Sequence, residues 1–343
     1  MLFHSSIRRE LGRSFTATFV VLITVIMTIM LIRTLGLATR GSVNPSEVMV
    51  VLGYTVLGHL PTILTLSLFI AIVACLSRMY ADSEMVIWFT AGRGLSGFIA
   101  PLMRFAWPIL LAIAALALVV WPWSNAQIQE LRERFEQRGD LERVAPGQFQ
   151  ESAGGSRVFF IDKDAADGRT GKNVFVYSND KGKESVTSAR SGRVEQQNGE
   201  RFLVLESGQR LESQAGNSPL RVSEFAQYGV RVGNPAALPT DTTPVKARSS
   251  LTLLRERTLV NQGELAWRLG LMLAAMNFVL IALAVSSVNP RAGRSGNLIL
   301  ALFAFVVYYN LINVGKNWIF SGRASFGEYM LGLHGAALLL AAL

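Results

Sequence analysis

Few residues of this 343-residue chain are suited to covalent chemistry. Gly171-Lys172 is partly similar to a phosphate-binding loop, but Ala166 stands where the first glycine is required and Asn173 where Ser or Thr would hold magnesium. Neither a metal-ligand spacing nor a neighbouring nucleophile accompanies the three histidines, which are His4, His59 and His334. We therefore predict no catalytic residue, no metal site and no nucleotide site, so energy for any work must come from a partner protein.

The strongest functional signal is a short amphipathic segment at residues 78–92, with acidic residues at its start. Ser83 is predicted to cap a helix whose positive N-terminal end suits Asp82 and Glu84, and Gly92 is predicted to end it. The apolar surface of this helix comprises Met85, Ile87, Trp88 and Phe89. The helix has two interpretations, contact with lipid or docking of a cytosolic protein. The acidic residues favour docking, because anionic lipid headgroups would repel them.

Membrane-spanning helices must position this segment. Half of the residues are hydrophobic and the mean hydropathy is +0.34, which is high for a chain whose middle third is polar. A helix needs about 20 apolar residues to cross a bilayer. Such runs predict six spans in a three-plus-three layout, at residues 15–32, 48–77, 105–123, 269–288 and 295–315, with a shorter sixth run at 330–343.

Basic residues in the short loops predict the orientation of the chain. With six spans, one side of the membrane holds Arg8, Arg9, Arg13, Arg78, Arg93, Arg104, Arg291 and Arg294. That side should be cytoplasmic, so the segment inserted between the third and fourth spans should lie in the periplasm of a Gram-negative cell. The net charge of +9 reflects mainly these loops and the inserted segment, and we predict no nucleic-acid binding.

The inserted segment has an extended rather than a helical pattern. Asn198-Gly199 predicts a hairpin, because both residues accept positive φ. Strands are predicted at residues 157–161, 173–177, 193–197, 201–205, 209–214 and 220–228. We predict an all-β sandwich or jelly roll, preceded by a charged stalk helix and followed by a proline-containing linker. The predicted domains are 1–126 with a cytoplasmic helix at about 80–91, the inserted domain 127–250, and 251–343.

Three basic residues lie on the predicted outer side, against the cytoplasmic bias. Arg33 and Arg40 follow the first span and Lys316 ends the fifth. Short outer loops often contain a few basic residues without a specific role. A lipid with several acyl chains and phosphates would instead need an apolar cavity bordered by cations at this level. The residues alone leave both interpretations open.

Several segments resemble the lipopolysaccharide-export permease family, LptF/LptG. Residues 79–84 with Ala91-Gly92 are similar to the family's coupling helix, which contacts an ATPase. The resemblance covers essentially the whole chain, including the three-plus-three layout. Residues 31–36 and 147–150 resemble the LptF member more than LptG. Further similar segments are 147–149, 264–268 and 287–294.

The resemblance implies a permease subunit of an ATP-driven ABC transporter in the inner membrane. Such a transporter extracts lipopolysaccharide and passes it to a periplasmic protein bridge toward the outer membrane. The implied partners are LptG, an LptB ATPase dimer, LptC, LptA through the β domain, lipopolysaccharide and membrane lipid. The chain itself would bind no cofactor and would not be an enzyme, since the ATPase would use ATP and Mg²⁺. Alternatives are an LptG-type subunit or a non-transporting subunit that only transmits ATPase motion.

The resemblance also assigns residues to two contacts. Glu84 would meet a basic site on the ATPase, with Asp82, Met85 and Trp88 around it. On the outer side, the first and fifth spans would form a lateral gate. The residues expected to contact lipopolysaccharide there are Arg33, Arg40 and Lys316.

Overall fold

The structure is a computed structural model that describes residues 2–39, 43–92, 94–137, 149–151, 157–160, 162, 170–180, 183–197, 200–214, 220–231, 243–286 and 293–342. The chain forms two compact units. The helical unit contains residues 1–33, 49–129 and 243–343, and the second unit contains residues 34–48 and 130–242. The predicted inserted domain at 127–250 lies largely in the second unit, but residues 127–129 and 243–250 belong to the helical one.

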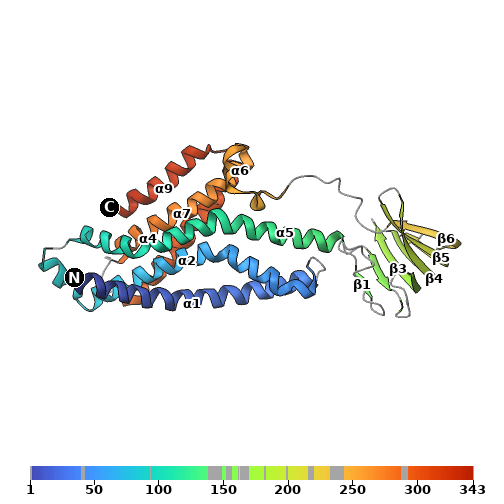
Figure 1. Ribbon diagram of the computed structural model, residues 1–343, viewed down its shortest axis with the longest axis horizontal. Coiled ribbons are helices and arrows are strands. Elements are labelled where there is room, and N and C mark those ends of the chain that lie inside the picture. Colours follow the sequence, from blue (N-terminus) through green and yellow to red (C-terminus); the bar gives the residue numbers. More distant parts are fainter. Residues whose placement is uncertain are drawn as a thin grey trace. The chain divides into compact units, whose positions relative to one another are not determined.

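Long apolar helices dominate the helical unit (Figure 1). Five stretches are long and apolar enough to cross a membrane, at residues 7–39, 48–81, 95–134, 259–286 and 296–320, while 326–342 is shorter. The described residues therefore do not establish the predicted count of six spans. The α-helices are α1 (Leu2–Thr39), α2 (Val48–Ala81), α3 (Glu84–Thr90), α4 (Ile99–Ala115), α5 (Trp121–Gln137), α6 (Ser250–Arg255), α7 (Leu259–Ser286), α8 (Gly293–Phe320) and α9 (Phe326–Ala342).

Shorter helical turns join these elements. The 3₁₀ turns are η1 (Pro45–Glu47), η2 (Leu95–Phe98) and η4 (Val245–Ala247), and a π-helical turn, η3 (Leu116–Val120), joins α4 to α5. The third predicted span is therefore the middle of one longer helical stretch that continues into the charged α5.

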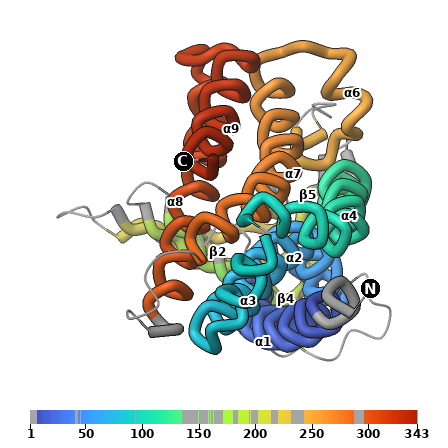
Figure 2. Tube along the Cα trace, turned by 90° about the vertical axis from the view of Figure 1, so that its left-hand side faces the viewer, coloured from blue at the N-terminus to red at the C-terminus, as the bar shows by residue number. Residues whose placement is uncertain are grey.

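Helix α7 is the centre of the helical unit. It contacts α4, α8 and α9, and Figure 2 shows it between α4 and α9. Its Phe278 ring lies 4.6 Å from Phe69 of α2 and 5.2 Å from Phe305 of α8, measured between ring centroids. Where lipid is the alternative environment, such ring contacts stabilise helix association through van der Waals packing, so α7 is the helix on which its neighbours pack.

The helical unit has two distinct ends. Helix α3 lies beside the start of α1, at the end that faces the viewer in Figure 2. From there α4 and η3 run for 20 residues, from Ile99 to Leu118, and Leu118 contacts Ser250 at the start of α6. At 1.5 Å per helical residue this separates the two ends by about 30 Å. We call them the α3 end and the α6 end.

The second unit contains one antiparallel sheet with its strands in consecutive order. The strands are β1 (Gln150–Glu151), β2 (Arg157–Phe160), β3 (Thr170–Asp180), β4 (Lys183–Gln197), β5 (Glu200–Gln214) and β6 (Arg221–Arg231). The predicted all-β character is confirmed. A consecutive order is a meander, so the described residues do not establish the predicted jelly roll, whose two sheets are joined by Greek-key crossovers.

Strand β5 is continuous where the sequence predicted two strands. The expected break fell at residues 206–208, because Ser207-Gly208 is typical of a turn. In the structure Ser207 adopts a φ of 53°, and it is left out of the pairing with both neighbouring strands. Pairing resumes on the same register at Gly208, so Ser207 interrupts the pairing without ending the strand.

Candidate functional site

The turn before α3 differs from the predicted cap. Ser83 has a φ of 58° and a ψ of 14°, and its side chain does not accept a hydrogen bond from the helix N-terminus. A capping serine needs an extended backbone, and the turn of two residues between α2 and α3 does not provide one. Gly92, with a φ of 80°, follows the helix as predicted.

Arg78 gathers the acidic residues at this end. Its guanidinium donates at 2.9 Å to Asp82 Oδ2 and at 2.9 Å to Glu84 Oε1, and it also pairs with Glu10 of α1. The side chains of Asp82 and Glu84 are 52% and 42% exposed. Exposed pairs of this kind contribute about 1 kcal/mol or less, so they are readily exchanged for pairs with another protein.

The four residues predicted to contact the ATPase do not share one exposed surface. Glu84 and Asp82 are accessible, Trp88 packs partly against the core, and Met85 is only 1% exposed. Met85 therefore anchors α3 to the helical unit and has little surface to offer a partner. The exposed apolar side chains of α3 are Val86, Ile87 and Phe89.

The residues predicted to contact lipid phosphate have different surroundings. Arg33 is exposed near the end of α1, and Arg40 lies outside the described residues. Lys316, near the end of α8, pairs with Glu264 of α7 and has a side chain that is 15% exposed. Its ammonium group lies 5.3 Å from the Phe320 ring centroid and 5.8 Å from that of Trp267.

Glu264 is the centre of a buried polar cluster at the α6 end. Its side chain is 0% exposed and accepts hydrogen bonds from Trp121 Nε1 at 2.9 Å and from Arg268 Nε at 3.2 Å, besides pairing with Lys316. Arg268 is also 0% exposed. We call Glu264, Arg268 and Lys316 the buried charge cluster.

The sequence did not assign these acidic and basic residues of α7 a role. The fourth span was predicted to begin at residue 269, because the charged residues before it were placed outside the apolar run. The structure begins α7 at Leu259, so Glu264 and Arg268 lie within the helix and four residues apart. Opposite charges at that spacing beside an apolar run are the signal that could have identified them.

Comparison with known proteins is consistent with this arrangement. Residues 6–343 match the family model described as lipopolysaccharide export system permease LptF/LptG. The chain belongs to the LptF/LptG permease family. It is 29% identical over 309 residues to the lipopolysaccharide export system permease protein LptF of Escherichia coli (strain K12). The aligned residues cover 88% of this chain and 82% of the relative. The LptF of Shigella flexneri gives the same values.

The family match shows that this permease is a component of lipopolysaccharide export. Its several membrane-length helices are those expected of an inner-membrane protein. Glu264 and Lys316 of the buried charge cluster line a cavity of about 510 Å³, with Arg268 beside them. Lys246, Asn313 and Asn317 also line this cavity. Three cations and one anion therefore meet at or beside it, when Lys246 is counted with the cluster.

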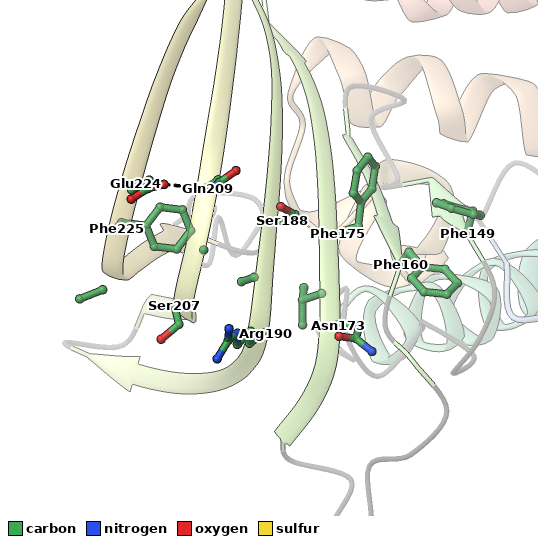
Figure 3. A pocket seen from close by; sticks show the side chains of 14 residues that line it. Phe149, Phe160, Asn173, Phe175, Ser188, Arg190, Ser207, Gln209, Glu224 and Phe225 are labelled. Atoms are coloured by element: carbon green, nitrogen blue, oxygen red, sulfur yellow. Dashed lines mark hydrogen bonds between the residues drawn. The ribbon is translucent and has the colours of Figure 1, made fainter.

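The β sheet of the permease carries a separate open groove of about 990 Å³ (Figure 3). Phe149, Phe160 and Phe175 gather at one side of the groove, with ring centroids of Phe149 and Phe160 4.7 Å apart. Phe225 lines the other side beside Gly208. A Cβ on Gly208 would lie 2.5 Å from that ring, so the glycine allows Phe225 to cover the strand.

A row of unpaired positions crosses the sheet along this groove. The pairing of β3, β4, β5 and β6 skips Asn173, Arg190, Ser207 and Ala226 at one level, with the register unchanged on both sides. Asn173 and Ser207 have φ angles of 51° and 53°. Figure 3 shows Asn173, Arg190 and Ser207 at this level. All four residues line the groove, and three of them, Asn173, Arg190 and Ser207, bring polar side chains to this level.

Proposed function

We propose that this chain is the LptF-type permease subunit of an ATP-driven transporter that moves lipopolysaccharide from the inner membrane to a periplasmic protein bridge. The observation that carries the proposal is the separation of two features within the same helical unit. An exchangeable acidic surface lies at the α3 end, and a cation-bordered cavity lies at the α6 end, about 30 Å away. This separation is what transmission of force across a membrane requires.

The α3 end is the docking site for the ATPase in this proposal. Glu84 leaves Arg78 and pairs with a basic residue of LptB, while the exposed Val86 and Ile87 contact its surface. The ATPase supplies ATP hydrolysis with Mg²⁺, and the permease binds no cofactor. The second half of the membrane assembly is the paralogue LptG.

Charge balance supports a phosphate contact at the α6 end. The buried charge cluster holds two positive charges and one negative charge, and thus one surplus positive charge. Lys316 is its most exposed member and lines the cavity. A lipid phosphate in the cavity would neutralise that surplus, and Arg33 offers a second cation on the same side of the membrane.

The groove of the β sheet supports passage of the lipid beyond the membrane. Acyl chains leaving the bilayer need an apolar surface that shields them from water, and the phenylalanines of the groove provide one. Strand β6 forms one edge of the sheet and exposes Val222. We propose that LptC or LptA adds a strand at an edge of this sheet. Unchanged binding after substitution of the edge residues would contradict that contact.

Co-purification from mild detergent tests the function directly. The wild-type permease is expected to bring with it a related permease and an ATPase, and Glu84→Lys should lose the ATPase while keeping the related permease. Glu130→Lys is a matched control, because Glu130 is also exposed and paired with an arginine but lies on α5. Normal recovery of the ATPase with Glu84→Lys would refute the docking role.

Photocrosslinking distinguishes transport from transmission of force alone. Arg33→Glu should reduce crosslinking of lipopolysaccharide to the outer ends of α1 and α8 in the assembled complex. Arg33 suits this test because it is exposed, whereas reversing Lys316 would disturb the buried charge cluster. Unchanged crosslinking would favour a subunit that only transmits motion.

A further inference from the structure

The chain that returns from the β domain enters the helical unit at residues 243–250, and Arg268 of α7 binds this segment. The Arg268 Nη2 atom donates to the carbonyl oxygens of Val245 at 3.5 Å, Lys246 at 3.2 Å and Arg248 at 3.1 Å. Its Nη1 atom donates to Ser250 Oγ at 2.8 Å. One buried guanidinium therefore holds four acceptors within six residues.

Three helices meet at the Glu264 carboxylate, which also binds the Arg268 guanidinium. The carboxylate accepts from Arg268 on α7, from Trp121 on α5 and from Lys316 on α8. The return segment is therefore bound to a point at which α5, α7 and α8 are already joined. Arg248 adds a contact, since its Nη1 donates to Asn261 Oδ1 of α7 at 3.2 Å.

Ser250 extends this network to the π turn. Its hydroxyl donates to the carbonyl oxygen of Leu118 at 2.6 Å, within η3. A π turn is wider than an α turn and often marks a functional position in a helix. Through Ser250, the third membrane-length helix and Arg268 are both connected to the returning chain.

Burial makes this connection difficult to break and specific for arginine. A buried guanidinium without its partners is strongly unfavourable, so the segment and the helices separate only at a large cost in free energy. Lysine would retain the charge beside Glu264, but its single ammonium group cannot reach the same four acceptors. The contacts therefore transmit displacement between the helices and the segment.

We infer that Arg268 is a positioning residue that couples movement of the membrane helices to the β domain through residues 245–250. The inference rests on the proposed function, because coupling has meaning only if the helices move during a transport cycle. ATPase-driven movement of α5, α7 and α8 then displaces residues 245–250, the membrane end of the returning chain. Transfer of lipid to the periplasmic bridge depends on that displacement, whereas ATP hydrolysis does not.

The test uses the complete reconstituted transporter and measures lipopolysaccharide transferred per ATP hydrolysed. For Arg268→Lys we expect this ratio to fall about tenfold, while ATPase activity stays within about twofold of wild type. Ser250→Ala removes one acceptor and one link to η3, and it should reduce the ratio by a smaller factor. A merely structural defect would instead lower the yield of complex without changing the ratio.

Ser249→Ala is the matched control. Ser249 caps α6 by accepting from the Thr252 backbone N–H at 3.1 Å, so the variant loses a local hydrogen bond next to Ser250 without touching Arg268. It should keep the wild-type ratio. The inference is overturned if Ser249→Ala and Ser250→Ala behave alike, or if Arg268→Lys transfers lipid normally. If Arg268→Lys yields no complex, the comparison of Ser249→Ala with Ser250→Ala tests the inference instead. Absence of transfer by the wild-type transporter would instead refute the proposed function.

Discussion

Neutralising Glu264 should destabilise the permease more than removing Lys316. Glu264→Gln keeps the shape of the side chain but raises the net charge of the buried charge cluster from one to two. Arg268 then remains 0% exposed without a counter-charge. Loss of one partner from a buried ion pair costs about 3–5 kcal/mol. We expect about 3 kcal/mol, because Arg268 keeps its carbonyl acceptors.

Lys316→Met should have the smaller effect because it balances the cluster. Glu264 and Arg268 remain as a neutral pair, and only one charged hydrogen bond is lost, at about 1.5 kcal/mol. For a chain of this size each kcal/mol corresponds to about 2 °C in Tm, which predicts decreases of about 6 °C for Glu264→Gln and about 3 °C for Lys316→Met. The assay is thermal unfolding of the purified protein in detergent.

The double variant gives the sharpest result. In the Glu264→Gln background, Lys316→Met removes one of two uncompensated positive charges, so it should restore part of the lost stability. Lys316→Met should lower Tm in the wild-type background and raise it in the Glu264→Gln background. A decrease in both backgrounds would refute the charge balance assigned to the cluster.

Two glycine predictions test the packing of the two units separately. Gly315→Ala should destabilise the helical unit by about 1–3 kcal/mol, because a Cβ there would lie 1.8 Å from the Tyr329 ring. Gly332→Ala is the control for the helical unit. It should not lower Tm, because a Cβ there would have no atom within 4 Å. Gly208→Ala should destabilise the sheet by a similar amount, since its Cβ would lie 2.3 Å from a backbone oxygen. Gly229→Ala is the control for the sheet, and hydrogen exchange of the sheet amides is the measurement. An equal effect within either pair would contradict the packing.

Elements with a strong local pattern could be predicted from the sequence. The apolar runs identified the five membrane-length helices, and the acidic residues before Met85 identified α3. Strands β3 and β6 were also found, because alternating apolar residues need no distant partner to be recognised. The limits of these elements were less accurate. Strand β4 begins at Lys183, ten residues before its predicted start, in a Ser- and Gly-containing stretch with no strand pattern of its own.

The buried charge cluster could not be predicted, because its stability depends on contacts between distant residues. Glu264 and Lys316 are 52 residues apart, and Ser250 and Leu118 are 132 apart. Taken alone, each charged residue indicates the end of a membrane span, which is why α7 was predicted to start ten residues too late. Burial of Glu264 depends on partners from α5 and α8 in addition to Arg268 of its own helix. The burial of Met85 likewise depends on packing that its own segment does not specify.

The two arginines at opposite ends of the helical unit differ in exposure, and this difference determines their roles. Arg78 holds carboxylates that are 42% and 52% exposed, so water and salt weaken the pairs and a partner's basic residue can take over Glu84 at little cost. Arg268 holds acceptors away from water, where exchange would leave a charge unpaired. The α3 end is therefore suited to an association that changes, and the α6 end to a connection that persists. A transporter driven by an external ATPase needs both properties, in that order along the path of force.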